Sequence, residues 1–312
     1  MRREWRLAHG RSLILGEKAI LMGILNVTPD SFSDGGLHDD LPRALAAAHA
    51  MREQGAAIID VGGESTRPDA VPVDAATEQA RILPVIGALA KSTDCIISVD
   101  TYREQTARLA VAAGAHIVND VWGLQREPGI ANGEPGIANG EPGIANGEPG
   151  IANGEPGIAN EPGIADLAAE TGAGLVIMHT GRERERDPDV IADQFAFLDR
   201  SLGIARAARV EESRIVLDPG FGFAKDSHEN VMLMARFAEL QRFGFPLLVG
   251  TSRKRLIGAM TGRDAADRDA GTAATSAILR LAGADIFRVH NVAMNRDALA
   301  VADAILESGA AE

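Results

Sequence analysis

A regular alternation limits the fold of this chain: eight short apolar runs are separated by longer amphipathic segments. The runs are expected to be strands, at residues 19–25, 58–61, 96–99, 117–118, 175–178, 215–217, 247–249 and 286–289. Helical spacing of apolar residues predicts helices at 41–54, 75–91, 104–113, 191–208, 228–243, 270–282 and 296–307. Eight such units in roughly 280 residues predict an α/β fold, a (β/α)₈ or TIM barrel, for which about 250 residues is typical. A doubly wound open sheet is the alternative, disfavoured because no G-x-G-x-x-G follows the first run.

One segment does not fit the alternation. The unit EPGIANG recurs from Glu127, and residues 127–160 consist of its copies. Inside a helix Pro costs about 3 kcal/mol and Gly about 1 kcal/mol, so this composition excludes a helix. Pro-Gly and Asn-Gly are turn dipeptides, so we expect a disordered insert in the fourth βα-loop. The rest of residues 1–312 is expected to form a single domain.

Composition excludes several classes of protein. The chain has 31 basic and 44 acidic residues and a net charge of −13, which argues against a nucleic-acid binder. The single cysteine, Cys95, excludes an intrachain disulfide and a cysteine-based zinc site. No apolar run approaches about 18 residues, the length that a membrane helix needs. We therefore expect a cytoplasmic protein with no membrane partner.

Polar residues follow nearly every apolar run at its C-terminal side. In a parallel barrel all strand C-termini lie on one face, so these side chains should converge on one mouth. A single carboxylate after a strand is usually a helix cap, but so many together predict a pocket. The set comprises Asn26, Asp60, Glu64, Asp100, Asn119, Asp120, His179, Asp218, Ser252, Arg253, Lys254, Arg288 and His290.

The residue types in this predicted pocket suggest its ligands. A cationic set suits phosphate or carboxylate oxygens: Arg67, Arg253, Lys254, Arg288 and His290. Asn26 and Asp34 offer oxygen ligands suited to Mg²⁺, which usually binds phosphates with few protein ligands. Asp100, Asn119 and Asp218 suit a flat heterocycle rich in N–H groups, since a carboxylate accepts two parallel N–H bonds.

Two long segments resemble the signatures of the dihydropteroate synthase family. They are residues 22–36, MGILNVTPDSFSDGG, and residues 60–68, DVGGESTRP. Shorter matches follow in the same order at residues 98–101, 119–120, 178–179, 218–223, 251–254 and 288–290. The resemblance covers the chain outside the repeat. It implies a (β/α)₈ barrel, usually a homodimer, that is a transferase of folate biosynthesis and a target of sulfonamide drugs. The implied reaction joins 7,8-dihydropterin-6-ylmethyl diphosphate to p-aminobenzoate and releases pyrophosphate with Mg²⁺.

The resemblance also implies residue roles. Asp100, Asn119, Asp218 and Lys254 would hold the pterin, with Met178 and Phe223 lining its pocket. Asn26 would bind the metal–diphosphate, and Asp100, Lys254 and Asn26 are the expected catalytic residues. The diphosphate and p-aminobenzoate would be bound by Thr66, Arg67, Ser252, Arg253, Arg255, Arg288 and His290. Arg255 stands where many relatives carry Ser, and Asn291 replaces a frequent Asp, so these two positions depart from the pattern.

Alternatives to this activity remain open at this point. A methyltetrahydrofolate methyltransferase-like enzyme would share the pterin pocket but would not need the diphosphate residues Asn26, Arg67 and Arg288. A non-catalytic pterin-binding paralogue, or an enzyme inactivated by its insert, would keep every motif residue. His179 and Asp120 also have structural interpretations, as a strand-end residue and as a cap.

Overall fold

Eight parallel strands form the centre of the protein. The computed structural model describes residues 2–28, 37–64, 73–126 and 163–309. The strands, in spatial order, are β8 (Ile215–Asp218), β7 (Gly174–Met178), β6 (Ile117–Asp120), β5 (Ile96–Asp100), β4 (Ile58–Gly62), β3 (Ile20–Asn26), β10 (Ile286–Val289) and β9 (Leu248–Val249). A parallel bridge between Leu217 and Leu247 joins β8 to the chain entering β9 and closes the ring. The predicted (β/α)₈ barrel is confirmed.

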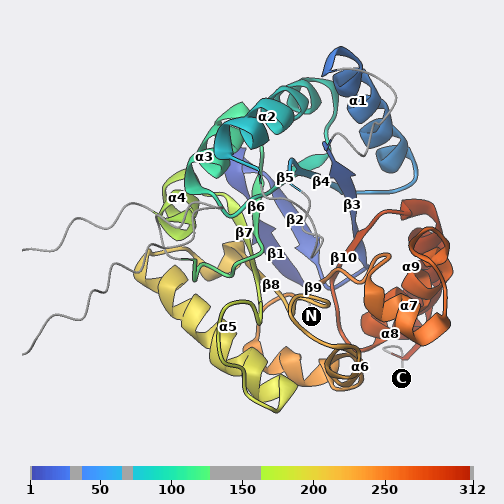
Figure 1. Ribbon diagram of the computed structural model, residues 1–312. Coiled ribbons are helices and arrows are strands. Elements are labelled where there is room, and N and C mark those ends of the chain that lie inside the picture. Colours follow the sequence, from blue (N-terminus) through green and yellow to red (C-terminus); the bar gives the residue numbers. More distant parts are fainter. Residues whose placement is uncertain (1, 29–36, 65–72, 127–162, 310–312) are drawn as a thin grey trace, which may run out of the picture.

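Helices surround the barrel on its outside (Figure 1). They are α1 (Leu37–Glu53), α2 (Ala75–Ser92), α3 (Glu104–Ala113), α4 (Ile164–Thr171), α5 (Val190–Ala207), α6 (Ser227–Ala235), α7 (Arg255–Thr261), α8 (Asp269–Leu281) and α9 (Val292–Gly309). Outward side chains of the strands, such as Leu25, Val61 and Val99, share one apolar core with buried helix residues such as Ile86 and Leu299. No helix in the described ranges combines the length and apolarity needed to cross a bilayer.

The single helix predicted at 228–243 is wrong. α6 ends at Ala235, and residues Phe237–Phe243 form a 3-10 helix. Arg236, between them, has φ −104° and ψ 13°, and its guanidinium pairs with Asp189 and Glu239. Three residues per turn place Phe237 and Leu240 on one face, and both are fully buried. The apolar residues after Arg236 therefore lie on one face of a 3-10 helix and not on a continued α-helix.

The inside of the barrel changes from apolar to polar along most of its strands. Side chains two residues apart on a strand point to the same face. The lowest inward ring is apolar and comprises Met22, Ile58, Ile96, Ile117, Val176, Val216, Leu248 and Ile286. Two residues further along the same strands stand Ile24, Asp60, Ser98, Asn119, Met178, Asp218, Gly250 and Arg288. Because side chains alternate along a strand, the same inward face that packs the floor of the barrel also presents most of the candidate functional side chains at the next level.

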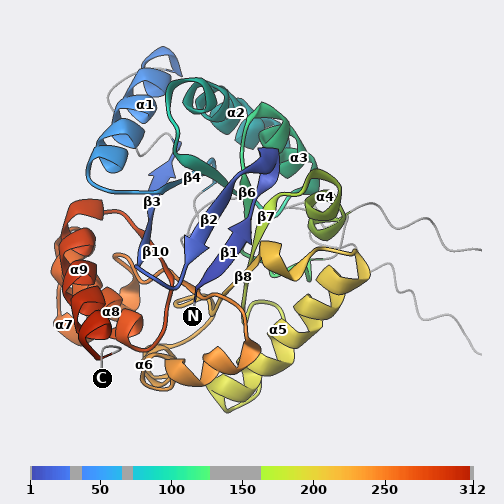
Figure 2. The ribbon, with the colours of Figure 1, turned by 180° about the vertical axis from the view of Figure 1, so that it is seen from behind.

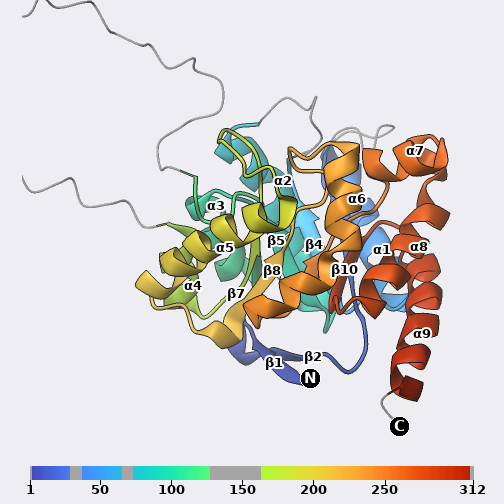
Figure 3. The ribbon, with the colours of Figure 1, turned by 90° about the horizontal axis from the view of Figure 1, so that it is seen from below.

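An N-terminal hairpin, which the sequence analysis did not predict, covers the floor of the barrel. β1 (Arg3–Arg6) pairs antiparallel with β2 (Ser12–Leu15). Trp5, Leu7 and Leu15 pack against the lowest inward ring, and the Trp5 indole N–H donates to the carbonyl of Arg214 at 2.8 Å. Figures 2 and 3 show this hairpin across one end of the barrel. Access to the interior is therefore left to the opposite end, where the strands terminate.

Candidate active site

A buried cluster of two carboxylates and one guanidinium lies at the mouth. Arg288, from β10, donates through Nε to Asp60 Oδ2 and through Nη2 to Asp100 Oδ2, each at 2.6 Å. Asn119 Nδ2 donates to the same oxygen of Asp60 at 3.3 Å. The carboxylates come from β4 and β5, so parallel strands distant in sequence bring these charges together. With two carboxylates and one guanidinium, the cluster carries a net negative charge when both acids are ionised.

Burial determines the protonation behaviour of this cluster. Burial raises the pKa of Asp100 to about 7; Asp60 acts in the same direction, and Arg288 opposes both. Burial alone would lower the pKa of Arg288, but Asp60 and Asp100 outweigh it and raise that pKa above its ordinary value. Arg288 therefore stays charged. Asp60 is fully buried, and its Oδ1 has no hydrogen-bond partner among the described residues.

A carboxylate and an ammonium face each other on the next part of the wall. Asp218, at the end of β8, accepts from the N–H of Gly220 at 2.7 Å, and burial raises its pKa while Lys254 opposes the rise. Burial lowers the pKa of Lys254 to about 8. The Lys254 ammonium donates to the carbonyl of Phe221 at 2.5 Å and lies 4.4 Å from the centre of the Phe223 ring. This wall offers a charged acceptor, a charged donor and an aromatic face.

Apolar side chains complete the pocket lining that the sequence predicts. Met178, Phe223 and Val121 form a small buried cluster, and Tyr102 and Trp122 pack against it. The cluster lies at the mouth, because Met178 is at the C-terminal end of β7 and Phe223 follows β8. The predicted pterin residues therefore come together in the structure.

The remaining predicted site residues lie around this centre. Asn26 Oδ1 and Asp100 Oδ2 are each 3.8 Å from the position that a Cβ would take on Gly62, so they flank the same glycine. Ser252 Oγ is 2.9 Å from His290 Nδ1 and accepts from the backbone N–H of His290 at 3.1 Å. Thr66, Arg67 and Asp34 lie outside the described residues, so their predicted roles stay predictions.

Two predicted anion-binding residues have other surroundings. Arg253 donates from Nε and Nη2 to the two carboxylate oxygens of Asp269, at 2.7 and 2.8 Å. Asn291 Nδ2 donates to the same carboxylate at 2.9 Å, which gives the asparagine a local structural role. Arg255 is exposed at the first position of α7. The roles predicted for Arg253 and Arg255 toward substrate stay predictions.

Some polar residues at strand ends stabilise the surrounding structure through hydrogen bonds. Asp120 accepts from the backbone N–H groups of Trp122 at 2.9 Å and Leu124 at 2.7 Å. Glu64 accepts from Arg103 at 2.8 Å, and Arg103 also donates to the carbonyl of Val73 at 2.5 Å. Arg103 therefore ties together the residues just before and just after 65–72.

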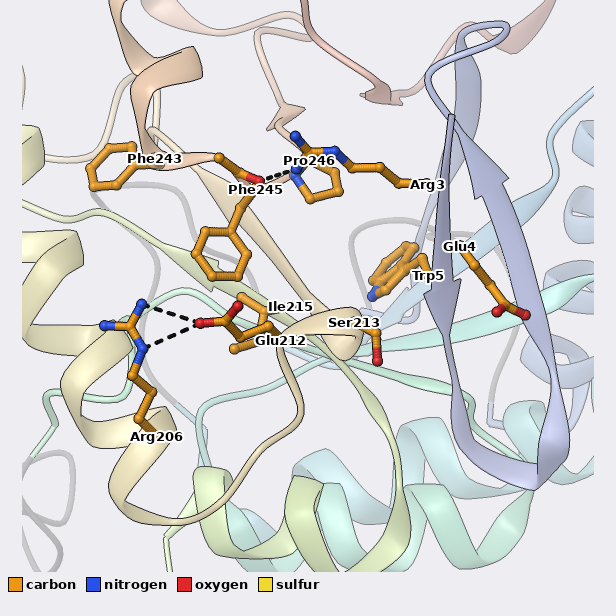
Figure 4. Close-up of a pocket in the computed structure, with 11 residues that line it drawn as sticks. Arg3, Glu4, Trp5, Arg206, Glu212, Ser213, Ile215, Phe243, Phe245 and Pro246 are labelled. Carbon is orange, nitrogen blue, oxygen red and sulfur yellow. Dashed lines mark hydrogen bonds and ion pairs between the residues drawn. The ribbon is translucent and has the colours of Figure 1, made fainter. Parts of the chain in front are cut away.

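A cavity of about 570 Å³ lies away from this mouth (Figure 4). Its lining includes Arg3 and Trp5 of the hairpin and Phe245 of the segment before β9. Trp5 also packs on the lowest inward ring, so the cavity is at the closed end of the barrel. Arg206 and Glu212 in its wall form an ion pair with each other.

Sequence reasoning placed Asp60 at the mouth but did not identify it as the ion-pair partner of Arg288. The two residues are 228 positions apart, so only the closure of the barrel reveals the pair. The sequence analysis gives Lys225 no role, although its ammonium donates to the carbonyl of Gly220 at 2.9 Å. A lysine directly after the strand-end motif DPGFGFA was the available signal.

Comparison with known proteins gives this arrangement a context. The profile of a family described as pterin binding enzyme matches residues 22–133 and 141–290. The chain is 40% identical over 293 residues to the dihydropteroate synthase of Bacillus subtilis, covering 94% of this chain and 90% of that protein. It is 38% identical over 307 residues to the dihydropteroate synthase of Escherichia coli K12, covering 96% of each.

Solved structures of the same kind superpose on the barrel. The dihydropteroate synthase of Xanthomonas albilineans, solved with 4-aminobenzoic acid, has a TM-score of 0.82 at 37% identity, covering 97% of this chain and 98% of that chain. A Clostridium difficile dihydropteroate synthase, solved in the presence of pteroic acid, has a TM-score of 0.80 at 37% identity, covering 93% and 98%. A Yersinia pestis dihydropteroate synthase with a sulfonamide drug has a TM-score of 0.79 at 35% identity, covering 96% and 98%.

Proposed function

The chain belongs to the pterin-binding enzyme family and is a dihydropteroate synthase, and we propose which of its residues carry each part of that reaction. It condenses 7,8-dihydropterin-6-ylmethyl diphosphate with p-aminobenzoate, giving 7,8-dihydropteroate and pyrophosphate. The convergence of Asp60, Asp100, Asp218, Lys254 and Arg288 at one mouth supports the roles proposed below. The test is a coupled assay for pyrophosphate release, which should require both substrates. Release at the same rate without p-aminobenzoate would contradict the assigned reaction.

The pterin ring is assigned to the wall formed by Asp218, Asn119 and Lys254. The Asp218 carboxylate can accept two parallel N–H groups from one edge of the heterocycle. The Asn119 amide and the Lys254 ammonium supply donors for its nitrogen and carbonyl acceptors. Met178 and Phe223 present apolar surface to the flat ring. This combination selects a planar ligand that carries both donors and acceptors on its edges.

The diphosphate is assigned to the cationic side of the mouth. Arg288 and His290 lie on the same strand end, and Ser252 is hydrogen bonded to His290. A guanidinium matches the oxygens of a phosphate group in geometry and charge. Arg67, Thr66, Arg253 and Arg255 are assigned to the same anions or to the benzoate carboxylate on the resemblance alone.

The reaction needs charge stabilisation more than proton transfer. The C–O bond between the pterin methylene and the diphosphate breaks, and the electron pair leaves with the diphosphate. The amine nitrogen of p-aminobenzoate forms the new C–N bond and loses a proton. Positive charge that develops on the pterin methylene is stabilised by Asp60 and by Asp100 in its ionised form, in which the cluster with Arg288 is net negative. Arg288 and the other cationic residues assigned to the diphosphate stabilise the leaving group.

Magnesium fits the residues at Gly62 as a metal bound largely by substrate. The described residues contain no group of three or more His, Cys, Asp or Glu side chains suited to a metal ion. Mg²⁺ usually takes one or two protein oxygens together with phosphate oxygens and water. Asn26 Oδ1 provides one such oxygen, next to the carboxylate of Asp100. When bound, the ion would neutralise charge on the diphosphate.

Replacing Asn26 by alanine should reduce turnover about tenfold or more and raise the Mg²⁺ concentration needed for half-maximal activity. The physical reason is the loss of the protein oxygen proposed to bind the metal–diphosphate. A Mg²⁺ titration of initial rates measures both effects. Asn291→Ala is the control, because Asn291 donates to Asp269, and its Mg²⁺ curve should match that of the unmodified enzyme. An unchanged curve for Asn26→Ala would remove Asn26 from the metal site.

We propose a homodimer through the outer faces of α8 and α9. Apolar side chains are exposed there: Ile278 and Leu281 on α8, and Met294, Val301 and Ile305 on α9. The two helices lie side by side (Figure 1), and we propose that these residues form one apolar surface. A patch of this kind usually marks a protein interface. The cytoplasmic location stays a prediction.

Val301→Glu should convert the dimer to a monomer, because Val301 is 63% exposed in the single chain and would be buried on association. Light scattering coupled to size-exclusion chromatography measures the mass. Leu109→Glu on α3 is the matched control, since Leu109 is also an exposed apolar helix residue and lies outside this surface. Equal masses for the two variants would exclude the proposed interface.

Deleting residues 127–160 should leave a folded, active enzyme that is more sensitive to sulfonamides. The repeat itself lies outside the described residues, but it begins directly after Arg126, whose guanidinium is 4.0 Å from the Tyr102 ring centre at the mouth. Shortening a loop from about 40 to about 6 residues changes closure entropy by only about 1.5–2 kcal/mol. Each repeat carries a Glu and no basic residue, so the tract adds negative charge to an enzyme whose substrates are anions.

The resemblance implies that sulfonamides occupy the p-aminobenzoate pocket and project beyond the outline of that substrate, so we propose that the tract after Arg126 excludes the drug more than the substrate. The quantity to measure in both proteins is the ratio of the sulfonamide Ki to the p-aminobenzoate KM. We expect the deletion to lower this ratio. Equal ratios would show that the repeat has no part in discrimination.

A further inference from the structure

The loop that follows β8 has an unusual backbone. It runs from Asp218, at the end of β8, past Phe223 to Ala224, and three of its residues have left-handed φ angles. These are Gly220 at 66°, Gly222 at 78° and Ala224 at 49°. A β-carbon makes the left-handed region costly, so Ala224 needs support from its surroundings. A Cβ on Gly220 would lie 1.9 Å from the carbonyl oxygen of His179, so this loop is closely packed against the end of β7.

The ammonium of Lys225 binds this loop from beneath. It donates to the carbonyl of Gly220 at 2.9 Å, to the carbonyl of Phe223 at 3.5 Å and to Nδ1 of His179 at 2.9 Å. An ammonium has three donors, and here each has an acceptor. Two of these acceptors bracket the turn between Asp218 and Phe223, so one group joins the beginning of the loop to its end.

His179 fixes the position of the Lys225 ammonium. The His179 side chain is fully buried, and because Nδ1 accepts from Lys225, the ring proton is on Nε2, which donates to Asp193 Oδ2 at 2.9 Å. Arg184 Nη2 also lies 3.0 Å from this Nε2. Burial and the Lys225 charge lower the pKa of His179 to about 3, so the ring remains neutral. Arg184 donates to both oxygens of Asp193 at 2.8 and 2.7 Å and holds that carboxylate in place. The chain of contacts ends on α5, outside the barrel.

Burying the Lys225 ammonium is unfavourable, and nearby carboxylates offset part of this cost. Burial lowers the pKa of Lys225 to about 7; Lys254 and Arg184 act in the same direction, and Asp218 and Asp193 oppose it. The other side of the loop is held by Asn230 of α6, whose Oδ1 accepts from the N–H of Gly222 at 2.7 Å. A loop held on both sides presents Asp218 and Phe223 at fixed positions.

We infer that Lys225 is a positioning residue for pterin binding: its ammonium, held by His179, fixes the loop that carries Asp218 and Phe223. The inference rests on the proposed role of Asp218 in binding the pterin. Lys225 acts through the loop backbone, to which two of its three hydrogen bonds go. The expected signature is a change in the KM for the pterin substrate alone.

The test compares steady-state kinetics of Lys225→Met with those of the unmodified enzyme, after thermal unfolding has shown that both are folded. The KM for the pterin diphosphate should rise about tenfold, the loss expected from hydrogen bonds to a charged group. The kcat and the KM for p-aminobenzoate should change less than about twofold. Adding Ala224→Gly to Lys225→Met should lower the raised KM for the pterin diphosphate about threefold or more, because glycine adopts the left-handed conformation without a Cβ penalty.

Arg184→Met is the matched control. Arg184 contacts the same buried group, through Asp193 and through its Nη2, which lies 3.0 Å from His179 Nε2, but it donates to no carbonyl of the loop. It should lower thermal stability and leave the pterin KM unchanged. If Lys225→Met does not fold, Lys225→Gln, which retains two donors, is measured by the same criteria.

An unchanged pterin KM in a folded Lys225 variant, or equal changes in Lys225→Met and Arg184→Met, would overturn the inference. Failure of Ala224→Gly to restore binding would also overturn it, because Lys225 would then act on the substrate directly. Asp218→Asn separates this failure from failure of the proposed function. If Asp218→Asn also leaves pterin binding unchanged, the proposed pterin site itself is wrong.

Discussion

Replacing Arg288 by methionine is expected to lower the free energy of unfolding by about 3–5 kcal/mol, because it leaves buried carboxylates without their cation. Asp60 is fully buried, Asp100 is 8% exposed, and both bind Arg288 at 2.6 Å. Methionine fills a similar volume but donates no hydrogen bond. Turnover should fall about 100-fold or more, since the variant also loses a guanidinium proposed to bind the diphosphate.

The stability loss in Arg288→Met should depend on pH in a defined direction. The pKa of Asp100 is already raised to about 7 in the folded protein, above its ordinary value of 3.8. A carboxyl with a raised pKa favours folding while it is protonated and loses that contribution as pH rises through its folded pKa. Without Arg288 the pKa rises further. The difference in the free energy of unfolding between Arg288→Met and the unmodified protein should therefore be smaller at pH 5 than at pH 8.

Urea unfolding at the two pH values measures this prediction. Arg236→Met is the control, because Arg236 also bridges two carboxylates, Asp189 and Glu239, but does so at the surface. Arg236→Met should cause no comparable loss in the free energy of unfolding. A loss in Arg288→Met of less than about 1 kcal/mol at pH 8, the size typical of an exposed pair, would show that the cluster does not depend on its cation.

Replacing Asp218 by asparagine should weaken binding of a pterin analogue and leave pyrophosphate binding unchanged. An amide in place of the carboxylate puts one unmatched donor against the N–H groups of the pterin. Leaving such a group unsatisfied costs about 1–3 kcal/mol, which corresponds to roughly 5- to 150-fold in affinity. Titration calorimetry with each ligand measures the two affinities separately.

Asp120→Asn is the matched control for Asp218→Asn. Both carboxylates end a strand, are buried and accept backbone N–H groups. Asp120 binds the backbone of Trp122 and Leu124, so its replacement should reduce stability without changing pterin affinity. Equal pterin affinities for Asp218→Asn and the unmodified enzyme would remove Asp218 from the pterin site. Equal losses in the two variants would show that both act through folding.

The sequence by itself determined the barrel and most of the mouth. Short apolar runs between amphipathic segments permit few packings other than parallel strands covered by helices, so the fold followed from periodicity. Strand ends of a barrel share one face, so Asp100, Asn119, Asp218, Lys254 and Arg288 could be assigned to one pocket before any coordinates were known. The barrel and the grouping of these residues could be predicted because they depend only on the local apolar pattern and on a topology with few alternatives.

Only the tertiary structure decided which side chains bind each other. The Arg288 guanidinium could have served any of several carboxylates at the mouth, and the choice of Asp60 and Asp100 depends on strand order and on the depth of each residue. The hairpin that holds Trp5 and the break at Arg236 likewise depend on non-local packing. Lys225 shows the same limit, because its partner His179 lies 46 positions away on another strand end. Hydrogen bonds and ion pairs act over about 3 Å, and periodicity in a sequence does not specify positions to that precision.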